Sequence, residues 1–151
     1  MIFKDITPLL ADGPAFAEVV DALAGVYGPV DKVAGIEARG FILAAPVAAC
    51  LRAGFVPIRK KGKLPGPTYT RDYQLEYGTA TIEVHTDAFT SSDRVLVIDD
   101  VLATGGTMQA SAELCGTAGY RVLGLAVLID LRLAGDFVWN GLALRSLIRY
   151  E

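Results

Sequence analysis

The pattern of apolar residues predicts a chain that alternates between buried strands and amphipathic helices. Val95 to Ile98 is an uninterrupted β-branched and aliphatic run, which favours a strand buried on both faces of a parallel sheet. Asp12-Gly13-Pro14 starts a helix, because proline fits the first helical turn, and Tyr27-Gly28-Pro29 stops it. Further strands are predicted over Lys32–Glu37, Phe55–Ile58, Arg121–Ile129 and Leu142–Ile148, and further helices over Phe41–Ala53 and Met108–Ala118.

A hairpin interrupts this alternation. Tyr73 to Tyr77 and Thr79 to Val84 alternate well enough to form two antiparallel strands around Gly78. The predicted order is therefore βαβ, a hairpin insertion, a second βαβ and a closing strand. Such an order indicates an α/β fold, with a mainly parallel sheet flanked by helices on both faces.

Composition narrows the class of protein. The chain has 151 residues, which predicts one domain, and its 52% hydrophobic content argues against disorder. A net charge of −3 argues against a basic nucleic-acid surface, and no apolar stretch is long enough to span a membrane. Cys50 and Cys115 lie in apolar helical contexts without metal-ligand spacing, so we expect two reduced core cysteines and a cytoplasmic protein.

The candidate chemistry begins where the run Val95 to Ile98 ends. Asp99 and Asp100 follow at the carboxyl edge of the predicted sheet, the usual ligand crevice in open α/β sheets, and neighbouring side chains there point in different directions. Ala103-Thr104-Gly105-Gly106-Thr107 then leads into a predicted helix, whose first N–H groups attract an anion. This combination indicates a sugar phosphate site. The alternative is a buried strand followed by an ordinary turn.

Two further segments could bind a polyanion. Glu37-Ala38-Arg39-Gly40 follows a second strand, where Arg39 and backbone N–H groups could hold another phosphate. Arg59 to Lys63 places four cations in five residues, ahead of the loop Leu64-Pro65-Gly66-Pro67. Such a run could neutralise pyrophosphate while the loop moves as a lid. A solvated arginine and a solvated basic turn are the alternatives.

The thirteen residues Val95 to Thr107 resemble the phosphoribosyl pyrophosphate (PRPP) motif of type I phosphoribosyltransferases. Further segments narrow the resemblance to the adenine phosphoribosyltransferase family: Ile2–Ile6, Gly35–Phe41, Arg59–Gly66, Leu75–Gly78 and Tyr150-Glu151. The resemblance implies transfer of a phosphoribosyl group from PRPP to adenine, giving AMP and pyrophosphate. It also implies Mg²⁺ held mainly through PRPP, and a homodimer.

The same resemblance implies a role for each matching position. Phe3 would stack on one face of adenine and Leu131 on the other, while backbone groups around Ile2 and Lys4 would read the purine edge. Glu76 would handle the proton near the base, and together with Arg39 it forms the expected catalytic pair. The expected pyrophosphate ligands are Glu37, Ala38, Arg39, Lys60 and Lys63. The expected ribose 5-phosphate ligands are Asp99, Asp100, Ala103, Thr104, Gly105, Gly106 and Thr107.

The resemblance further implies one domain over residues 1–151, with hood elements near 1–10 and 130–141 and a flexible loop near 60–76. Family members usually carry an N-terminal helix before the phenylalanine at position 3, so we expect a shortened hood. Two alternatives stay open: transfer to hypoxanthine, guanine or orotate, and a PRPP-sensing regulator without catalysis. Against 6-oxopurines, no lysine follows the strand ending at Asp130, and Arg132 is the nearest cation.

Overall fold

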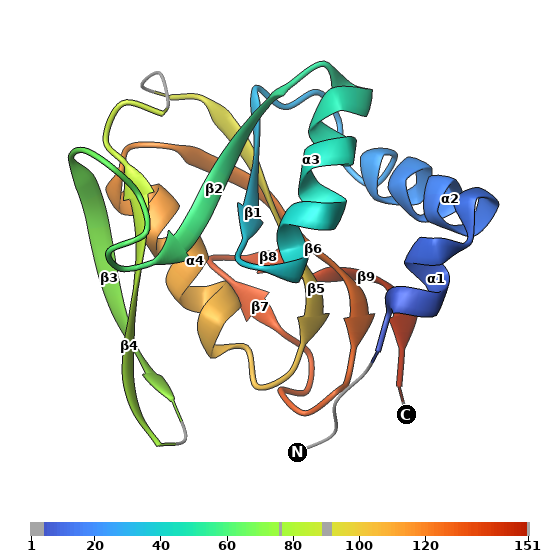
Figure 1. Ribbon diagram of the computed structural model, residues 1–151. Coiled ribbons are helices and arrows are strands. Elements are labelled where there is room, and N and C mark those ends of the chain that lie inside the picture. Colours follow the sequence, from blue (N-terminus) through green and yellow to red (C-terminus); the bar gives the residue numbers. More distant parts are fainter. Residues whose placement is uncertain (1–4, 76, 89–91, 151) are drawn as a thin grey trace.

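The computed structural model describes residues 5–75, 77–88 and 92–150. One sheet has the strand order β3-β4-β2-β1-β5-β6-β9 (Figure 1). Its strands are β1 (Lys32–Ile36), β2 (Gly54–Lys60), β3 (Thr68–Leu75), β4 (Gly78–His85), β5 (Arg94–Leu102), β6 (Arg121–Asp130) and β9 (Arg145–Arg149). The remaining elements are α1 (Thr7–Ala11), α2 (Gly13–Ala24), α3 (Arg39–Leu51), α4 (Gly106–Thr117) and the small hairpin of β7 (Val138–Trp139) and β8 (Leu142–Ala143).

The sheet is parallel from β2 through β1, β5 and β6 to β9, while β3 and β4 add an antiparallel ribbon at the β2 edge. Strand β5 lies at the centre and is buried on both faces, as its apolar run predicts. Val95 and Val97 pack in the cluster that contains the α4 side chains, whereas Leu96 and Ile98 pack in the cluster formed with α2 and α3. The predicted parallel α/β sheet with helices on both faces is therefore confirmed.

Helix α2 begins where its sequence predicts and ends earlier than expected. The Asp12 side chain accepts a hydrogen bond from the Ala15 N–H at 3.1 Å, which satisfies a free donor of the first turn. The helix ends at Ala24, and Tyr27 turns toward the sheet instead of the solvent. Its hydroxyl donates to the Leu125 carbonyl at 3.0 Å and accepts from the Leu125 N–H at 3.2 Å. Tyr27 thus satisfies β6 backbone groups just before β9 begins to pair at Ala126.

Several predicted boundaries were wrong. Strand β5 does not stop at Ile98 but continues through the carboxylates to Leu102, because Asp99 and Val101 still pair with β6. The ribbon strands are longer than expected, since β3 pairs with β4 from Thr68 onward. The closing strand is divided into β8 and β9, and Trp139 pairs with Leu142. Short helix α1 was not predicted.

The cysteine prediction was half right. Cys115 is buried in α4, and burial raises the pKa of its thiol to about 12. Cys50, expected in the core, is exposed on α3. No helix among the described residues is long and apolar enough to cross a membrane.

An ion pair joins the starts of the two central strands. Asp31, just before β1, accepts hydrogen bonds from the Arg94 backbone N–H at 2.8 Å and from its side-chain Nε and Nη2 at 3.1 and 3.2 Å. These Arg94 bonds hold the pKa of Asp31 at about 2. The contact secures one end of β1 and β5, and their opposite ends carry the candidate chemistry.

Gly124→Ala should destabilise the fold. A Cβ at this position in β6 would lie 2.2 Å from the Tyr27 ring, which its two hydrogen bonds to Leu125 hold in place. Overpacking of this kind costs about 1–3 kcal/mol. The measurement is urea unfolding, with Gly116→Ala as the control, because a Cβ at Gly116 in α4 meets nothing within 4 Å. The control should gain roughly 0.5–1 kcal/mol from helix propensity, and equal stabilities for the two variants would contradict the prediction.

Asp31→Asn should weaken the pH dependence of the free energy of unfolding at acidic pH. A carboxylate whose folded pKa is depressed stabilises the protein above its unfolded pKa, and this contribution disappears as pH falls through the folded value. For Asp31 that window runs from about 5 down to about 2. Unfolding measured at several pH values should show the largest difference between wild type and variant above the window. A difference that persists unchanged at pH 2 would sink the assignment.

Candidate active site

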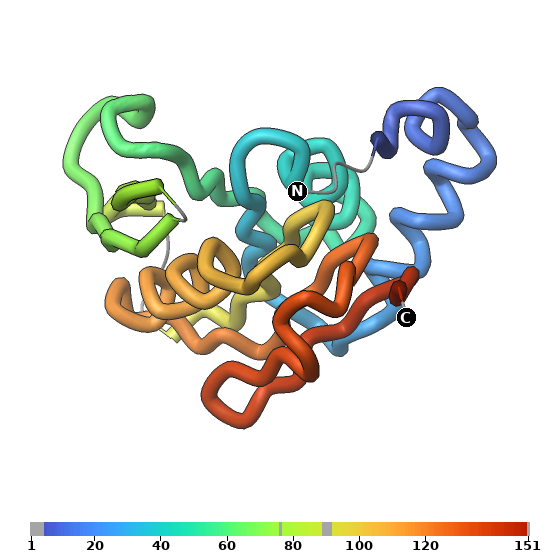
Figure 2. The backbone as a smooth tube through the Cα atoms, turned by 90° about the horizontal axis from the view of Figure 1, so that it is seen from below, coloured from blue at the N-terminus to red at the C-terminus, as the bar shows by residue number. Residues whose placement is uncertain are grey.

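A cleft opens at the carboxyl ends of the central strands, with a volume of about 590 Å³. Figure 2 shows this edge of the sheet from below, with the loop that follows β1 (cyan) near the loop that follows β5 (yellow-orange). The cleft is lined by Ile36, Glu37, Ala38, Arg39, Lys60, Tyr73, Asp99, Asp100, Val101, Ala103, Thr107, Leu131 and Leu133. The structure therefore brings together side chains from both predicted phosphate segments, the basic run and the carboxylate pair.

Arg39 and Asp100 connect the two halves of the cleft. The Arg39 Nε atom lies 2.7 Å from Asp100 Oδ2, and the Asp100 side chain is almost fully buried. Gly40 permits this approach, since a Cβ there would lie 3.0 Å from Asp99 Oδ1 and 3.2 Å from the Ile98 carbonyl oxygen. The first turn of α3 thus packs directly against the end of β5.

Asp99 has a different environment from its neighbour. Its Oδ1 accepts a hydrogen bond from the Asp100 N–H at 2.8 Å. Burial and the adjacent charge of Asp100 raise the pKa of Asp99 well above its ordinary range. The pair therefore combines a carboxylate that Arg39 binds with a carboxyl group whose pKa is raised. Both side chains can accept hydrogen bonds from the neighbouring hydroxyls of a sugar.

The loop after β5 forms a shallow cup of about 90 Å³ at the start of α4. Gly105 precedes the helix with a left-handed φ of 92°, which glycine adopts without strain. A Cβ on Gly105 would also lie 2.7 Å from the Phe137 ring, so the loop packs tightly on the segment after β6. The cup is lined by Asp99, Val101, Leu102, Ala103, Thr104, Gly105, Gly106, Thr107 and Met108. The unpaired N–H groups of the first helical turn make it suited to a phosphate.

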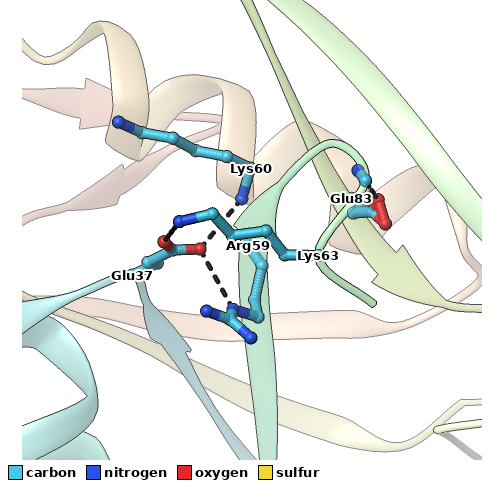
Figure 3. Close-up of polar contacts among 6 residues, drawn as sticks. Glu37, Arg59, Lys60, Lys63 and Glu83 are labelled. Carbon is cyan, nitrogen blue, oxygen red and sulfur yellow. Dashed lines mark hydrogen bonds and ion pairs between the residues drawn. The ribbon is translucent and has the colours of Figure 1, made fainter. Parts of the chain in front are cut away.

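Glu37 binds two cationic side chains of the basic run, Arg59 and Lys63 (Figure 3). Lys63 Nζ donates to Glu37 Oε2 at 2.6 Å, and Arg59 Nε donates to Oε1 at 3.1 Å. The backbone N–H of Lys60 also donates to Oε1, at 3.1 Å, while the Lys60 side chain extends away from Glu37. The peptide bond between Glu37 and Ala38 is cis.

These contacts set the charge of Glu37. Burial alone raises the pKa of this carboxyl, but the hydrogen bonds from Lys63, the Lys60 backbone and Arg59 outweigh it and lower the pKa to about 2. Glu37 is therefore an anion at neutral pH. A carboxylate repels a pyrophosphate, so the contribution of Glu37 to such a site is to hold the cations.

The segment after β6 closes the other side of the cleft. Leu131 and Leu133 line it, while Arg132 between them donates through Nη1 to Asp136 at 2.7 Å and to the Gly135 carbonyl at 3.3 Å. Buried Asp130 accepts from the Arg132 N–H at 2.8 Å. Nη1 of Arg132 thus bonds within its own loop.

Most predicted site residues meet in this cleft and its cup. Phe3, Lys4 and Glu76 lie outside the described residues. Sequence reasoning omitted Tyr73, Leu133 and Arg59 as site residues. Arg59 belongs to the basic run, so its charge was a usable signal. Tyr73 and Leu133 carry no chemical signature, and their place depends on how the ribbon and the connection from β6 to β7 fold back over the strand ends.

Comparison with known proteins agrees with this geometry. The family described as "Phosphoribosyl transferase domain" matches residues 9–147. The adenine phosphoribosyltransferase of Acidothermus cellulolyticus is 61% identical over 152 residues, covering 99% of this chain and 86% of that protein. The crystal structure of the Rhodothermus marinus adenine phosphoribosyltransferase superposes with a TM-score of 0.93 at 45% identity, covering 99% of this chain and 88% of that one.

A third relative was solved with a bound base analogue. The Giardia lamblia enzyme, complexed with 9-deazaadenine, is 38% identical and superposes with a TM-score of 0.90, covering all of this chain and 88% of that one. The match extends over nearly the whole length of each chain, and it includes the cleft described above. The chain belongs to the phosphoribosyltransferase family, within its adenine phosphoribosyltransferase branch.

Proposed function

We propose that this protein transfers the 5-phosphoribosyl group of PRPP to adenine, forming AMP and pyrophosphate. The observation that carries the proposal is the convergence of three parts on one cleft: the cup at α4, which suits a phosphate, the Asp99-Asp100 pair, which suits hydroxyls, and the cations Arg39 and Lys60, which suit pyrophosphate. PRPP has a matching sequence of 5-phosphate, ribose hydroxyls and pyrophosphate. The relatives' names supply the base.

PRPP would lie across the ends of β5 and β1. Its 5-phosphate would accept hydrogen bonds from the N–H groups of Ala103 to Thr107, a loop ending in the first turn of α4. Its ribose hydroxyls would bond to the Asp99 and Asp100 carboxylates. Its pyrophosphate would contact the N–H groups of Ala38 and Arg39 together with the Arg39 and Lys60 side chains, which line the cleft. Lys63 does not line the cleft, so it would reach the pyrophosphate only by leaving Glu37.

The base would enter beside the pyrophosphate half. Leu131 supplies an apolar wall of the cleft, and we place adenine between it and Phe3, with backbone groups around Lys4 reading the purine edge. Arg132 is already bonded to Asp136 and Gly135, so it is not directed at an exocyclic oxygen such as that of hypoxanthine. This arrangement favours adenine over 6-oxopurines.

The chemistry asks the protein to stabilise charge and to align the reactants. Breaking the bond between the anomeric carbon and pyrophosphate leaves positive charge on the sugar, which the two carboxylates offset, and negative charge on the leaving group, which Arg39 and the lysines offset. As N9 of adenine bonds to the anomeric carbon and pyrophosphate leaves, the base loses its N9 proton, which the departing pyrophosphate can accept; a protonated Glu76 would donate a hydrogen bond to N7. The loop Leu64–Pro67, closed over the cleft, would exclude water. This matters because hydrolysis of PRPP is the competing reaction.

We propose that Mg²⁺ is held at this site mainly through PRPP. No group of three or more His, Cys, Asp or Glu side chains that could hold a metal occurs among the described residues. We propose that PRPP oxygens provide most of the ligands near Asp99 and Asp100, as is usual for Mg²⁺ with phosphates. When bound, Mg²⁺ neutralises charge on the leaving pyrophosphate. We also propose a homodimer, as the family resemblance implies, and a cytoplasmic location, which two free cysteines favour.

A base-panel assay tests the proposed function. The protein is mixed with PRPP, Mg²⁺ and, in turn, adenine, hypoxanthine, guanine or orotate, and nucleotide and pyrophosphate are measured. We expect AMP from adenine and no product from the other bases, with loss of activity when Mg²⁺ is chelated. Turnover of hypoxanthine or orotate without adenine would overturn the assignment of the base. PRPP binding without any nucleotide product would favour the regulator.

Asp100→Asn should weaken PRPP use. The change removes the charge that pairs with Arg39 and replaces one of the two acceptor oxygens with an NH2 group, which cannot accept from a ribose hydroxyl, so the KM for PRPP should rise about tenfold or more. The KM for adenine should stay within about twofold, because no base contact changes. Asp31→Asn is the matched control: it makes the same chemical change at the opposite ends of β1 and β5. Equal PRPP constants for the two variants would remove Asp100 from the site.

A further inference from the structure

The turn that follows β2 carries its cations on a backbone held by few contacts. Lys61 N–H donates to the Thr81 carbonyl at 2.9 Å, and Lys63 N–H donates to the Lys60 carbonyl at 3.3 Å. Between them Gly62 adopts a left-handed φ of 93°. The residues of this turn, Lys60 to Lys63, are exposed, so apolar packing does not fix their conformation.

A buried carboxylate holds the centre of this turn. Glu83 Oε2 accepts a hydrogen bond from the Gly62 N–H at 2.9 Å, although Glu83 lies inside the ribbon strand β4 and is only 3% exposed. It stands opposite Arg59 in the pairing of β2 with β4. Burying a carboxylate is costly unless it is hydrogen-bonded, so this position opposes an arrangement in which Gly62 moves away.

Glu83 and Glu37 act on the same turn in different ways. Figure 3 shows them on opposite sides of it, with Lys63 between them. Glu37 lines the cleft and binds the Lys63 ammonium, whereas Glu83 is not among the cleft-lining residues and binds a backbone N–H. Glu83 is therefore placed to affect a ligand through the geometry of the turn.

We propose that Glu83 is a positioning residue for the pyrophosphate half of the site. By bonding to Gly62 it fixes the turn so that Lys60 faces the cleft and Lys63 reaches Glu37 at the cleft wall. It neither contacts substrate nor exchanges a proton in the reaction. The inference rests on the proposed function, because that function identifies the bound polyanion as pyrophosphate.

Variants of both bonded partners test this role. Glu83→Ala removes the acceptor, Glu83→Gln keeps an oxygen that can accept from Gly62, and Gly62→Ala keeps the donor but opposes the left-handed φ. Ser111→Ala is the control, since it also removes a buried polar group. The Ser111 hydroxyl, in α4, has no hydrogen-bond partner among the described residues. Each protein is assayed for the KM of PRPP, the KM of adenine and kcat, for pyrophosphate binding by calorimetry, and for Tm.

Glu83→Ala should raise both the KM for PRPP and the Kd for pyrophosphate about tenfold, the size expected for one hydrogen bond to a charged group. Its adenine KM and kcat should stay within about twofold of wild type. Glu83→Gln should restore both constants, and Gly62→Ala should shift them in the same direction as Glu83→Ala. Gly62→Ala also serves if Glu83→Ala fails to fold.

A lower Tm with unchanged PRPP and pyrophosphate constants would overturn the proposal, because Glu83 would then be structural alone. So would wild-type protein that binds no pyrophosphate. If wild type binds pyrophosphate but transfers nothing to adenine, the proposed function fails, whereas weaker pyrophosphate binding by Glu83→Ala still supports the positioning role. The two ideas therefore fail on different measurements.

Discussion

The Arg39–Asp100 ion pair is the contact on which the site depends. The two residues follow neighbouring parallel strands, and their 2.7 Å separation requires the first turn of α3 to pack on the end of β5. The strand register determines that meeting, because β1 and β5 pair from Lys32 opposite Val95 to Gly35 opposite Ile98. The register thereby fixes the proposed pyrophosphate ligand Arg39 and the proposed ribose ligand Asp100 to each other.

Other cations at the cleft are also paired with carboxylates. Arg39 has Asp100 as its partner, and Arg59 and Lys63 share Glu37. Binding of an anionic substrate as proposed would therefore replace the ion pairs of some of these cations with new ones. Internal carboxylates reduce the mutual repulsion of the basic run, which would otherwise disfavour a compact turn. Because carboxylates accompany the cations, the proposed site for a strongly anionic ligand is compatible with the net charge of −3.

The sequence was sufficient for the central features and insufficient for those that depend on tertiary contacts. The run Val95 to Ile98 predicted a doubly buried strand, and the glycines after it predicted the cup at α4. Five-residue helix α1 is too short for periodicity to reveal, and Asp5 supports it locally by accepting from Thr7. Glu83 reads as an ordinary polar strand position, and its role emerges only when the ribbon pairs with β2. The roles proposed for the site residues stay predictions, and for Phe3, Lys4 and Glu76 their position does too, because these three lie outside the described residues.

The contact of Gly105 with Phe137 carries a lesson for engineering new acceptor specificity. The aromatic ring occupies the space that a side chain on Gly105 would need, so the phosphate-binding turn and the connection after β6 form one packed unit. Replacing that connection with one that lacks an aromatic residue at this position would remove the ring that packs on the turn. A successful chimaera must therefore carry over an aromatic residue of similar volume, or exchange both loops as a cassette.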